Sequence, residues 1–177
     1  MQEVSGSTPL SSKLSNPRGL SDDPRLRARL LLVAWLTTLV GGLHFVDHVV
    51  RGNLVLQHGL DARWNHSGWP FLPSVTPFTF SLLGVALLLI GGLIGTSRGI
   101  LWALYWLVVS LVLIGLVTFV HFFGAEPELP RVIYSTYTAV GSPAFGVLAL
   151  VDFFGLVGLL IAGAVNAVSV ARESGRW

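Results

Sequence analysis

Residues 30–50, LLLVAWLTTLVGGLHFVDHVV, decide the fold of this chain. Asp47 is the one carboxylate in the run, and the run contains neither lysine nor arginine. At 1.5 Å per residue a helix of this length spans roughly 30 Å, which is the thickness of a bilayer's hydrocarbon core. The run therefore predicts a helix that crosses a membrane.

Three further apolar runs follow, at residues 78–94, 100–123 and 145–170, and the second is the shortest. Prolines and glycines bound them, so we expect four helices at about 28–50, 77–96, 99–123 and 144–171. Residues 1–24 are polar and rich in Ser, Pro and Gly, which predicts a flexible, disordered cytoplasmic tail. The expected fold is an all-α integral membrane protein, with residues 25–177 forming one antiparallel bundle of four transmembrane helices.

Composition agrees with a membrane protein and excludes several other classes. Hydrophobic residues make up 53% of the chain and charged residues only 11%, against about 25% charged in a typical soluble domain. The net charge of +2 comes from basic residues at helix ends and in the tail rather than in a stripe, so we expect no nucleic-acid partner. The absence of cysteine excludes disulfides, Fe–S clusters and thiolate metal ligands.

The distribution of lysine and arginine predicts the orientation of the bundle. Eight of these residues flank one side of the predicted spans and three flank the other, so both termini should lie in the cytoplasm. The eight are Lys13, Arg18, Arg25, Arg27, Arg29, Arg98, Arg172 and Arg176; the three are Arg51, Arg63 and Arg131. A single lysine among eleven cationic residues is typical of a GC-rich bacterial genome, so we expect a bacterial cytoplasmic membrane. Tyr134 and Tyr137 then belong to an outer loop at the headgroup level.

Small residues indicate where helices approach one another or a neighbour. Gly91 with Gly95, and Gly158 with Ala162, give the small-xxx-small spacing that lets membrane helices pack closely. Beyond the lipid bilayer, these faces offer contact sites for other membrane subunits.

The stretch His44-Phe45-Val46-Asp47-His48 is the most informative feature for function. Positions i, i+3 and i+4 share one face of a helix, and histidines one turn apart can offer two imidazoles to one metal ion. Asp47 is then a third ligand or the group that holds an imidazole tautomer. Arg51 continues this face one turn further and can neutralise Asp47.

Two other helices carry ionisable groups to the same level of the predicted bundle. A carboxylate inside a membrane helix costs about 2.5 to 3.5 kcal/mol, so Asp152 should face the interior, at a depth close to His44. His121 approaches from the third helix. All five histidines, including His58 and His66, fall on the outer side of the predicted topology, although these two are typical of solvated loop residues. The candidate metal ligands are His44, Asp47, His48, His121 and Asp152; the candidate haem or other cofactor ligands are His44, His48 and His121.

Several interpretations of this layer remain open at the level of sequence. The groups can bind a transition metal or haem, hold a quinone, relay protons, or form a hydrogen-bond network that fixes helix register. Small size and short loops are equally typical of a non-catalytic accessory or assembly subunit of a larger membrane complex. The sequence names no reaction, so whether the protein is an enzyme is not decided by these patterns.

Overall fold

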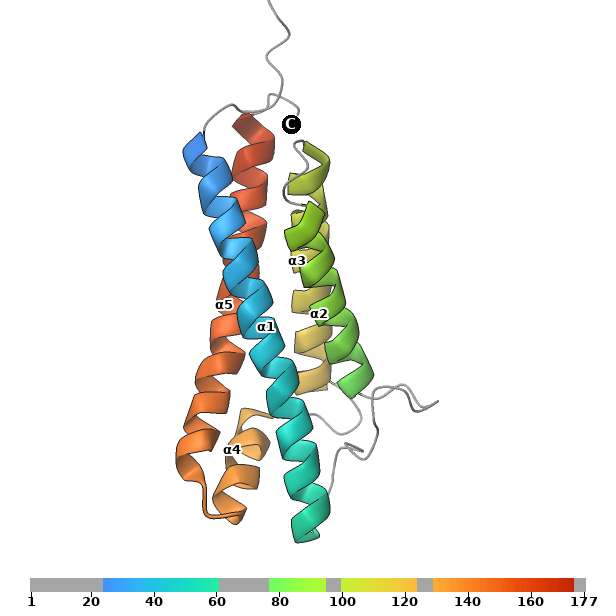
Figure 1. Cartoon of the computed structure of the whole chain (residues 1–177), viewed down its shortest axis with the longest axis vertical. Helices are drawn as coiled ribbons and strands as arrows, with labels where there is room; N and C mark the ends of the chain where they lie inside the picture. Colours follow the sequence, from blue (N-terminus) through green and yellow to red (C-terminus); the bar gives the residue numbers. More distant parts are fainter. Residues whose placement is uncertain (1–23, 61–76, 95–99, 124–128, 174–177) are drawn as a thin grey trace, which may run out of the picture.

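Every element of the described chain is helical in the computed structural model, which describes residues 24–60, 77–94, 100–123 and 129–173 (Figure 1). Proline begins four of the five α-helices, as expected where its missing N–H needs no acceptor. The elements are α1 (Pro24–His58), α2 (Pro77–Ile94), α3 (Ile100–Thr118), the π-helical turn η1 (Phe119–Phe123), α4 (Pro130–Ala139) and α5 (Pro143–Glu173).

The four longest helices run antiparallel to their chain neighbours and pack side by side (Figure 1). The most extensive contacts join α5 to α3 and to α1, while α2 packs mainly on α1. The short helix α4 lies at one end of the bundle, against the beginning of α5 and near the C-terminal end of α1. This end also contains η1, so it is where three parts of the chain bring polar side chains together.

Three helices are long and apolar enough to cross a membrane: Pro24–Val55, Trp102–Phe123 and Pro143–Glu173. The apolar part of α2, Leu82–Leu93, is shorter, so a fourth crossing stays a prediction. Twenty-five large hydrophobic side chains are exposed on the described surface, far more than isolated surface residues of a soluble protein require. A lipid-facing exterior explains them, and the expected class of all-helical membrane protein is supported.

The inward face of α1 repeats with a period close to 3.5 residues, which keeps one side of the helix against its neighbours throughout. The outward face carries exposed aliphatic side chains at the same period, including Leu32, Leu39, Val46 and Val50. The buried positions along the seam are Leu30, Ala34, Thr37, Gly41, His44, His48, Arg51 and Val55. His44 and His48 therefore occupy ordinary core positions of a helix bundle, whereas Asp47 is half-buried beside the seam.

Two expectations about helix boundaries are wrong. The first helix does not end at residue 50 but continues for about two more turns to His58, because Arg51, Gly52 and Val55 are buried there. Residues 130–139, expected as loop, form α4, in which Tyr137 is buried against the rest of the bundle. The predicted tail, His66 and Gly95 lie outside the described residues.

Of the two small-residue motifs, Gly91 makes a close helix contact. A Cβ at this position would lie 2.7 Å from Tyr105 Cε1 and 3.0 Å from Trp106 Cζ2, so only glycine lets α2 approach α3 here. Gly158 is exposed and a Cβ there would meet nothing within 4 Å, so its motif joins none of the helices that the structure describes.

Candidate metal centre

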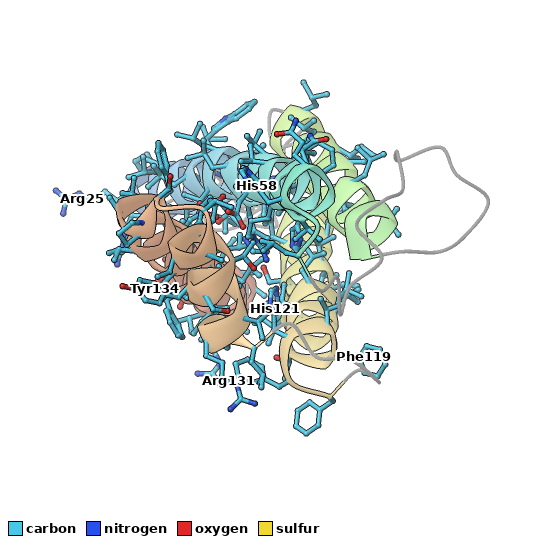
Figure 2. The ribbon with its side chains drawn as sticks, turned by 90° about the horizontal axis from the view of Figure 1, so that it is seen from below. Arg25, His58, Phe119, His121, Arg131 and Tyr134 are labelled. Atoms are coloured by element: carbon cyan, nitrogen blue, oxygen red, sulfur yellow. The ribbon has the colours of Figure 1, made fainter. Side chains whose placement is uncertain are left out.

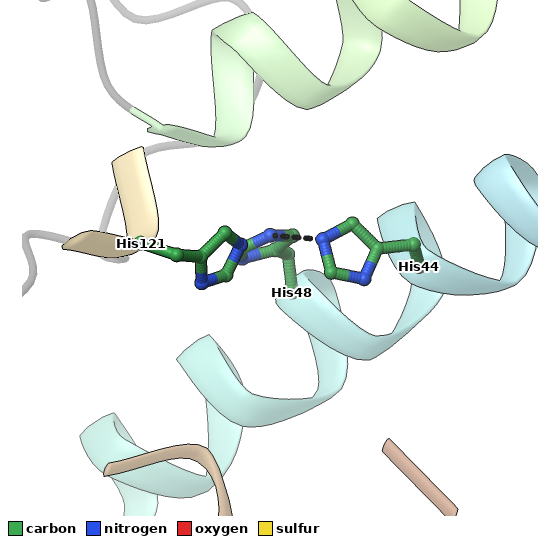
Figure 3. A group of neighbouring side chains, drawn as sticks. All are labelled: His44, His48 and His121. Atoms are coloured by element: carbon green, nitrogen blue, oxygen red, sulfur yellow. Dashed lines mark hydrogen bonds between the residues drawn. The ribbon is translucent and has the colours of Figure 1, made fainter. Parts of the chain in front are cut away.

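Three histidines converge in the interior of the bundle. His44 and His48 project from successive turns of α1, and η1 brings His121 toward them (Figure 3). All three are nearly inaccessible, at 5%, 1% and 1% exposure. Viewed along the bundle from the α4 end, His121 points inward whereas Phe119 and Arg131 point away from the core (Figure 2). The expected meeting of helices one and three in this layer is thus observed.

His121 lies in the π-helical turn and continues the inward face of α3. Leu113, Val117 and His121 follow one another at intervals of four residues and line the same cavity. Within η1, Phe119, Phe122 and Phe123 are exposed, and His121 is the buried residue. On its other side the His121 ring meets Phe153 of α5, with ring centroids 4.5 Å apart. Phe153 is itself 1% exposed, so it closes the layer against lipid.

The distances between the imidazoles suit a single ion. One ligand nitrogen from each histidine lies within 4.8 Å of the others, and the Nε2 atoms of His44 and His48 are 3.2 Å apart. Two nitrogens at 2.0–2.1 Å from a tetrahedral ion would be about 3.3 Å apart. The pair on α1 therefore has the required separation already, and His121 needs only a small movement to join it.

Asp152 acts on His44 rather than joining the three-histidine cluster. Its Oδ2 atom lies 3.3 Å from His44 Nδ1, the nitrogen that faces away from His48. A carboxylate on the far nitrogen orients a ligating imidazole and makes it more basic. The depth expected for Asp152 is confirmed by this contact, and its position indicates an orienting role.

Asp47 also lies outside the cluster, because both of its oxygens are occupied. Arg51 Nε donates to Oδ2 at 2.6 Å, and the Tyr137 hydroxyl donates to Oδ1 at 2.6 Å. The expected neutralisation of Asp47 by Arg51 is confirmed. Burial and the hydrogen bond to Asp47 both raise the pKa of Tyr137, which lies in α4 outside the candidate spans, so its hydroxyl remains a donor.

Arg51 connects this ion pair to the histidines and fixes their tautomers. Its NH2 group lies 3.3 Å from His48 Nδ1, and a guanidinium can only donate. His48 Nδ1 therefore accepts, which leaves the proton of the neutral ring on Nε2 to donate to His44 Nε2. His44 in turn donates from Nδ1 to Asp152. The hydrogen bonds thus run in one direction, from Arg51 to Asp152.

Tyr137 is the one member of this hydrogen-bond network that the sequence does not predict. The predicted members are His44, Asp47, His48, Arg51 and Asp152. Asp47, the partner of Tyr137, lies 90 residues earlier in the chain, and Pro127 and Pro130 favour a loop in this region, so spacing gives no sign of the contact. His58, expected to be solvated, is exposed in the last turn of α1.

Comparison with protein families, curated proteins and solved structures finds no match to this chain. The geometry of the buried histidines therefore carries the functional conclusion: the cluster can hold a metal ion.

Proposed function

We propose that this protein is a membrane-embedded transition-metal protein whose ion is bound by His44, His48 and His121. The observation that carries the proposal is the convergence of three buried imidazoles, with ligand nitrogens within 4.8 Å of one another. Imidazole favours zinc, copper, iron and nickel over magnesium or calcium, which prefer oxygen ligands. Three protein ligands leave one coordination position open, the pattern of sites that bind a further molecule.

The charges around the cluster support a cation. Asp47 and Arg51 neutralise each other through their short ion pair. The carboxylate of Asp152 contacts Nδ1 of His44. The His44 ring would therefore lie between this negative charge and a metal ion bound at Nε2. A buried carboxylate in a membrane helix is costly unless a positive charge compensates it, and the ion would supply that charge.

The alternative occupants fit less well. The cavity beside the histidines has a volume of about 50 Å³, whereas pockets for drug-sized ligands are typically about 300–1,000 Å³. A haem or a quinone would require the helices to separate. A proton relay through His48, His44 and Asp152 is the alternative that the hydrogen bonds themselves allow. It does not use His121, which the metal site does.

We further propose that α2 forms a fourth crossing and that both termini are cytoplasmic, which would place the histidines toward the outer face of a bacterial cytoplasmic membrane. The charge asymmetry across the spans supports this orientation. Reporter fusions after Trp177 and at Ser97 should report cytoplasm, and a fusion at His66 should report the outside. An outside signal after Trp177 would contradict the orientation.

Metal analysis of the detergent-purified protein tests the proposed site. After equilibration with buffered Zn²⁺ or Cu²⁺, the wild-type chain should retain one ion, and His44→Ala, His48→Ala and His121→Ala should each lower affinity by about 100-fold or more. His58→Ala is the matched control, because His58 is an exposed histidine of the same helix. Occupancy should also fall in acid, since only neutral imidazole binds metal.

Two results would contradict the metal site. Wild-type protein that retains no more metal than the triple histidine variant would leave the layer as a structural network, the role expected of an accessory subunit. A Soret band in the purified protein would indicate haem instead.

A further inference from the structure

The histidine cluster opens onto a cavity that is otherwise apolar. Apart from the three imidazoles, its wall consists of leucines, valines and two glycines from α1, α2, α3, η1 and α5. The volume of about 50 Å³ accommodates one very small molecule or a few waters. Because the imidazoles form part of this wall, the open position of a bound ion would face the cavity.

Water is a poor occupant of this space. A buried water needs two to four polar partners, and cavities lined by aliphatic groups stay dry while still binding apolar atoms such as xenon. The imidazoles of His44 and His48 already bond to each other and to Asp152 and Arg51. The aliphatic wall offers no further donor or acceptor, so a metal-bound water would lack the partners that stabilise it in a hydrolytic site.

The rim of the cavity is partly exposed at the surface of the helix bundle. Val85 of α2, Leu116 and Val117 of α3, and Val120 of η1 line the cavity and are only half-buried. Small uncharged molecules dissolve in the hydrocarbon core, so this rim gives them a route from the bilayer that ions and polar solutes do not share.

From these observations we infer that the site binds a small uncharged diatomic molecule, of the class of dioxygen, nitric oxide or carbon monoxide, at the open position of a copper or iron ion. The inference rests on the proposed function, and it selects copper or iron over zinc because Zn²⁺ has no redox chemistry and binds such uncharged diatomics poorly. Binding is reversible coordination: the diatomic donates a lone pair to the metal, and no bond within the protein is made or broken.

Carbon monoxide is the probe, because it coordinates copper(I) without changing the metal's oxidation state. Full-length protein in detergent is loaded with copper(I), its copper content is measured, and bound CO is quantified by its infrared absorption. The wild-type chain should bind one CO per copper. In parallel, xenon binding to the metal-free protein is followed by xenon NMR, which tests the cavity independently of the metal.

Val117→Phe should fill the cavity without removing a ligand. We expect it to retain copper and to weaken both CO and xenon binding by about tenfold or more. Val108→Phe is the matched control, because Val108 lies on the same helix, is 58% exposed and does not line the cavity. Gly84→Ala is a milder second variant, since its Cβ would lie 3.3 Å from Leu113 Cδ2 and reduce the same space.

The outcomes separate the two proposals. Copper retained with no CO bound, xenon absent from the metal-free cavity, or unchanged binding in both cavity variants would each overturn the diatomic ligand while leaving the metal site in place. Wild-type protein that retains zinc but no copper would overturn the diatomic ligand, and wild-type protein that retains neither ion would overturn the metal site as well. One CO per copper, lost in the cavity variants and kept in Val108→Phe, supports the inference.

Discussion

The two halves of the bundle satisfy their buried polar groups in different ways. In the half that contains Trp102 and Trp106, here the Trp half, buried side chains donate to backbone carbonyls, as when Trp102 Nε1 donates to Gly91 O at 3.1 Å. Thr37, Thr38 and Tyr105 do the same. In the half that contains the histidines, here the His half, side chains bond to side chains from three helices.

This difference separates polar groups that only stabilise the fold from polar groups that can bind a ligand. A hydroxyl that donates to the carbonyl four residues earlier is satisfied within its own helix, so it needs no hydrogen-bond partner on a neighbouring helix. Among the described residues, the Trp half even leaves Trp106 Nε1 and Ser110 Oγ buried without a hydrogen-bond partner. Hydrogen bonds between side chains of different helices instead fix the tautomers of the histidines and the position of the charged groups around them. Such fixed geometry favours the binding of a ligand.

The largest effect in the His half outside the ligands themselves should come from Asp152→Asn. An asparagine keeps the size of the side chain but removes the charge that accepts the hydrogen bond from His44 and orients its ring. We expect metal affinity to fall by about 10- to 100-fold, as for other partners of ligating histidines. Competition with a chelator of known affinity measures the change. If the metal affinity of Asp152→Asn equals that of the wild type, Asp152 has no role in metal binding.

Arg51→Gln should act in the opposite direction. When His48 binds metal through Nε2, its proton must lie on Nδ1, where Arg51 now donates. Two donors would then face each other, whereas a glutamine oxygen can accept the Nδ1 proton. We expect metal affinity to rise by about tenfold in the same chelator competition, at some cost in stability because Asp47 loses its partner.

A matched variant makes the Arg51 result interpretable. Arg51→Met also removes the charge and the donor but supplies no comparable acceptor. If Arg51→Met and Arg51→Gln raise affinity equally, removal of the Arg51 charge and donor explains the gain, and acceptance of the His48 Nδ1 proton by glutamine contributes nothing.

The local part of this network could be predicted from sequence and the rest could not. Spacing alone places His44, Asp47, His48 and Arg51 on one face of a helix, and counting turns from the helix ends brings Asp152 to the level of His44. These inferences need only helical geometry. They therefore hold wherever the chain forms a regular, buried helix.

The parts that escaped prediction depend on irregular or tertiary structure. The π-helical turn at Phe119–Phe123 has no signature that helical spacing reveals, although the presence of His121 in this layer is expected from the sequence. Gly52 and Asn53 interrupt the apolar run after residue 50, yet packing against α4 keeps the helix intact to His58. That packing also buries Tyr137, whose partner Asp47 lies 90 residues earlier in the chain.

Tyr137→Phe tests whether α4 belongs functionally to the His half. The change removes the hydrogen bond to Asp47, which keeps its ion pair with Arg51, so unfolding should become about 1–1.5 kcal/mol more favourable. Because the pKa of Tyr137 is raised, this contribution is fully present below about pH 10 and is lost as the pH rises through the folded-state pKa. Unfolding in mixed micelles at pH 7 and at increasing alkaline pH measures both effects. A wild-type advantage that grows with alkaline pH would contradict the assignment.

The smallest effect should come from Thr38→Val in the Trp half. Thr38 Oγ1 donates to Ala34 O at 2.9 Å and lies 3.3 Å from Leu88 O of α2, and valine replaces the hydroxyl with a methyl group of similar size. Interhelical hydrogen bonds in membrane proteins contribute about 0.6 kcal/mol on average, so stability should fall by about that amount. Metal affinity should not change, because Thr38 bonds to the backbone and is not part of the chain that reaches the histidines. A shift in metal affinity comparable to that of Asp152→Asn would show that the two halves are coupled, and the division between polar groups that only stabilise the fold and polar groups that can bind a ligand would not hold for this bundle.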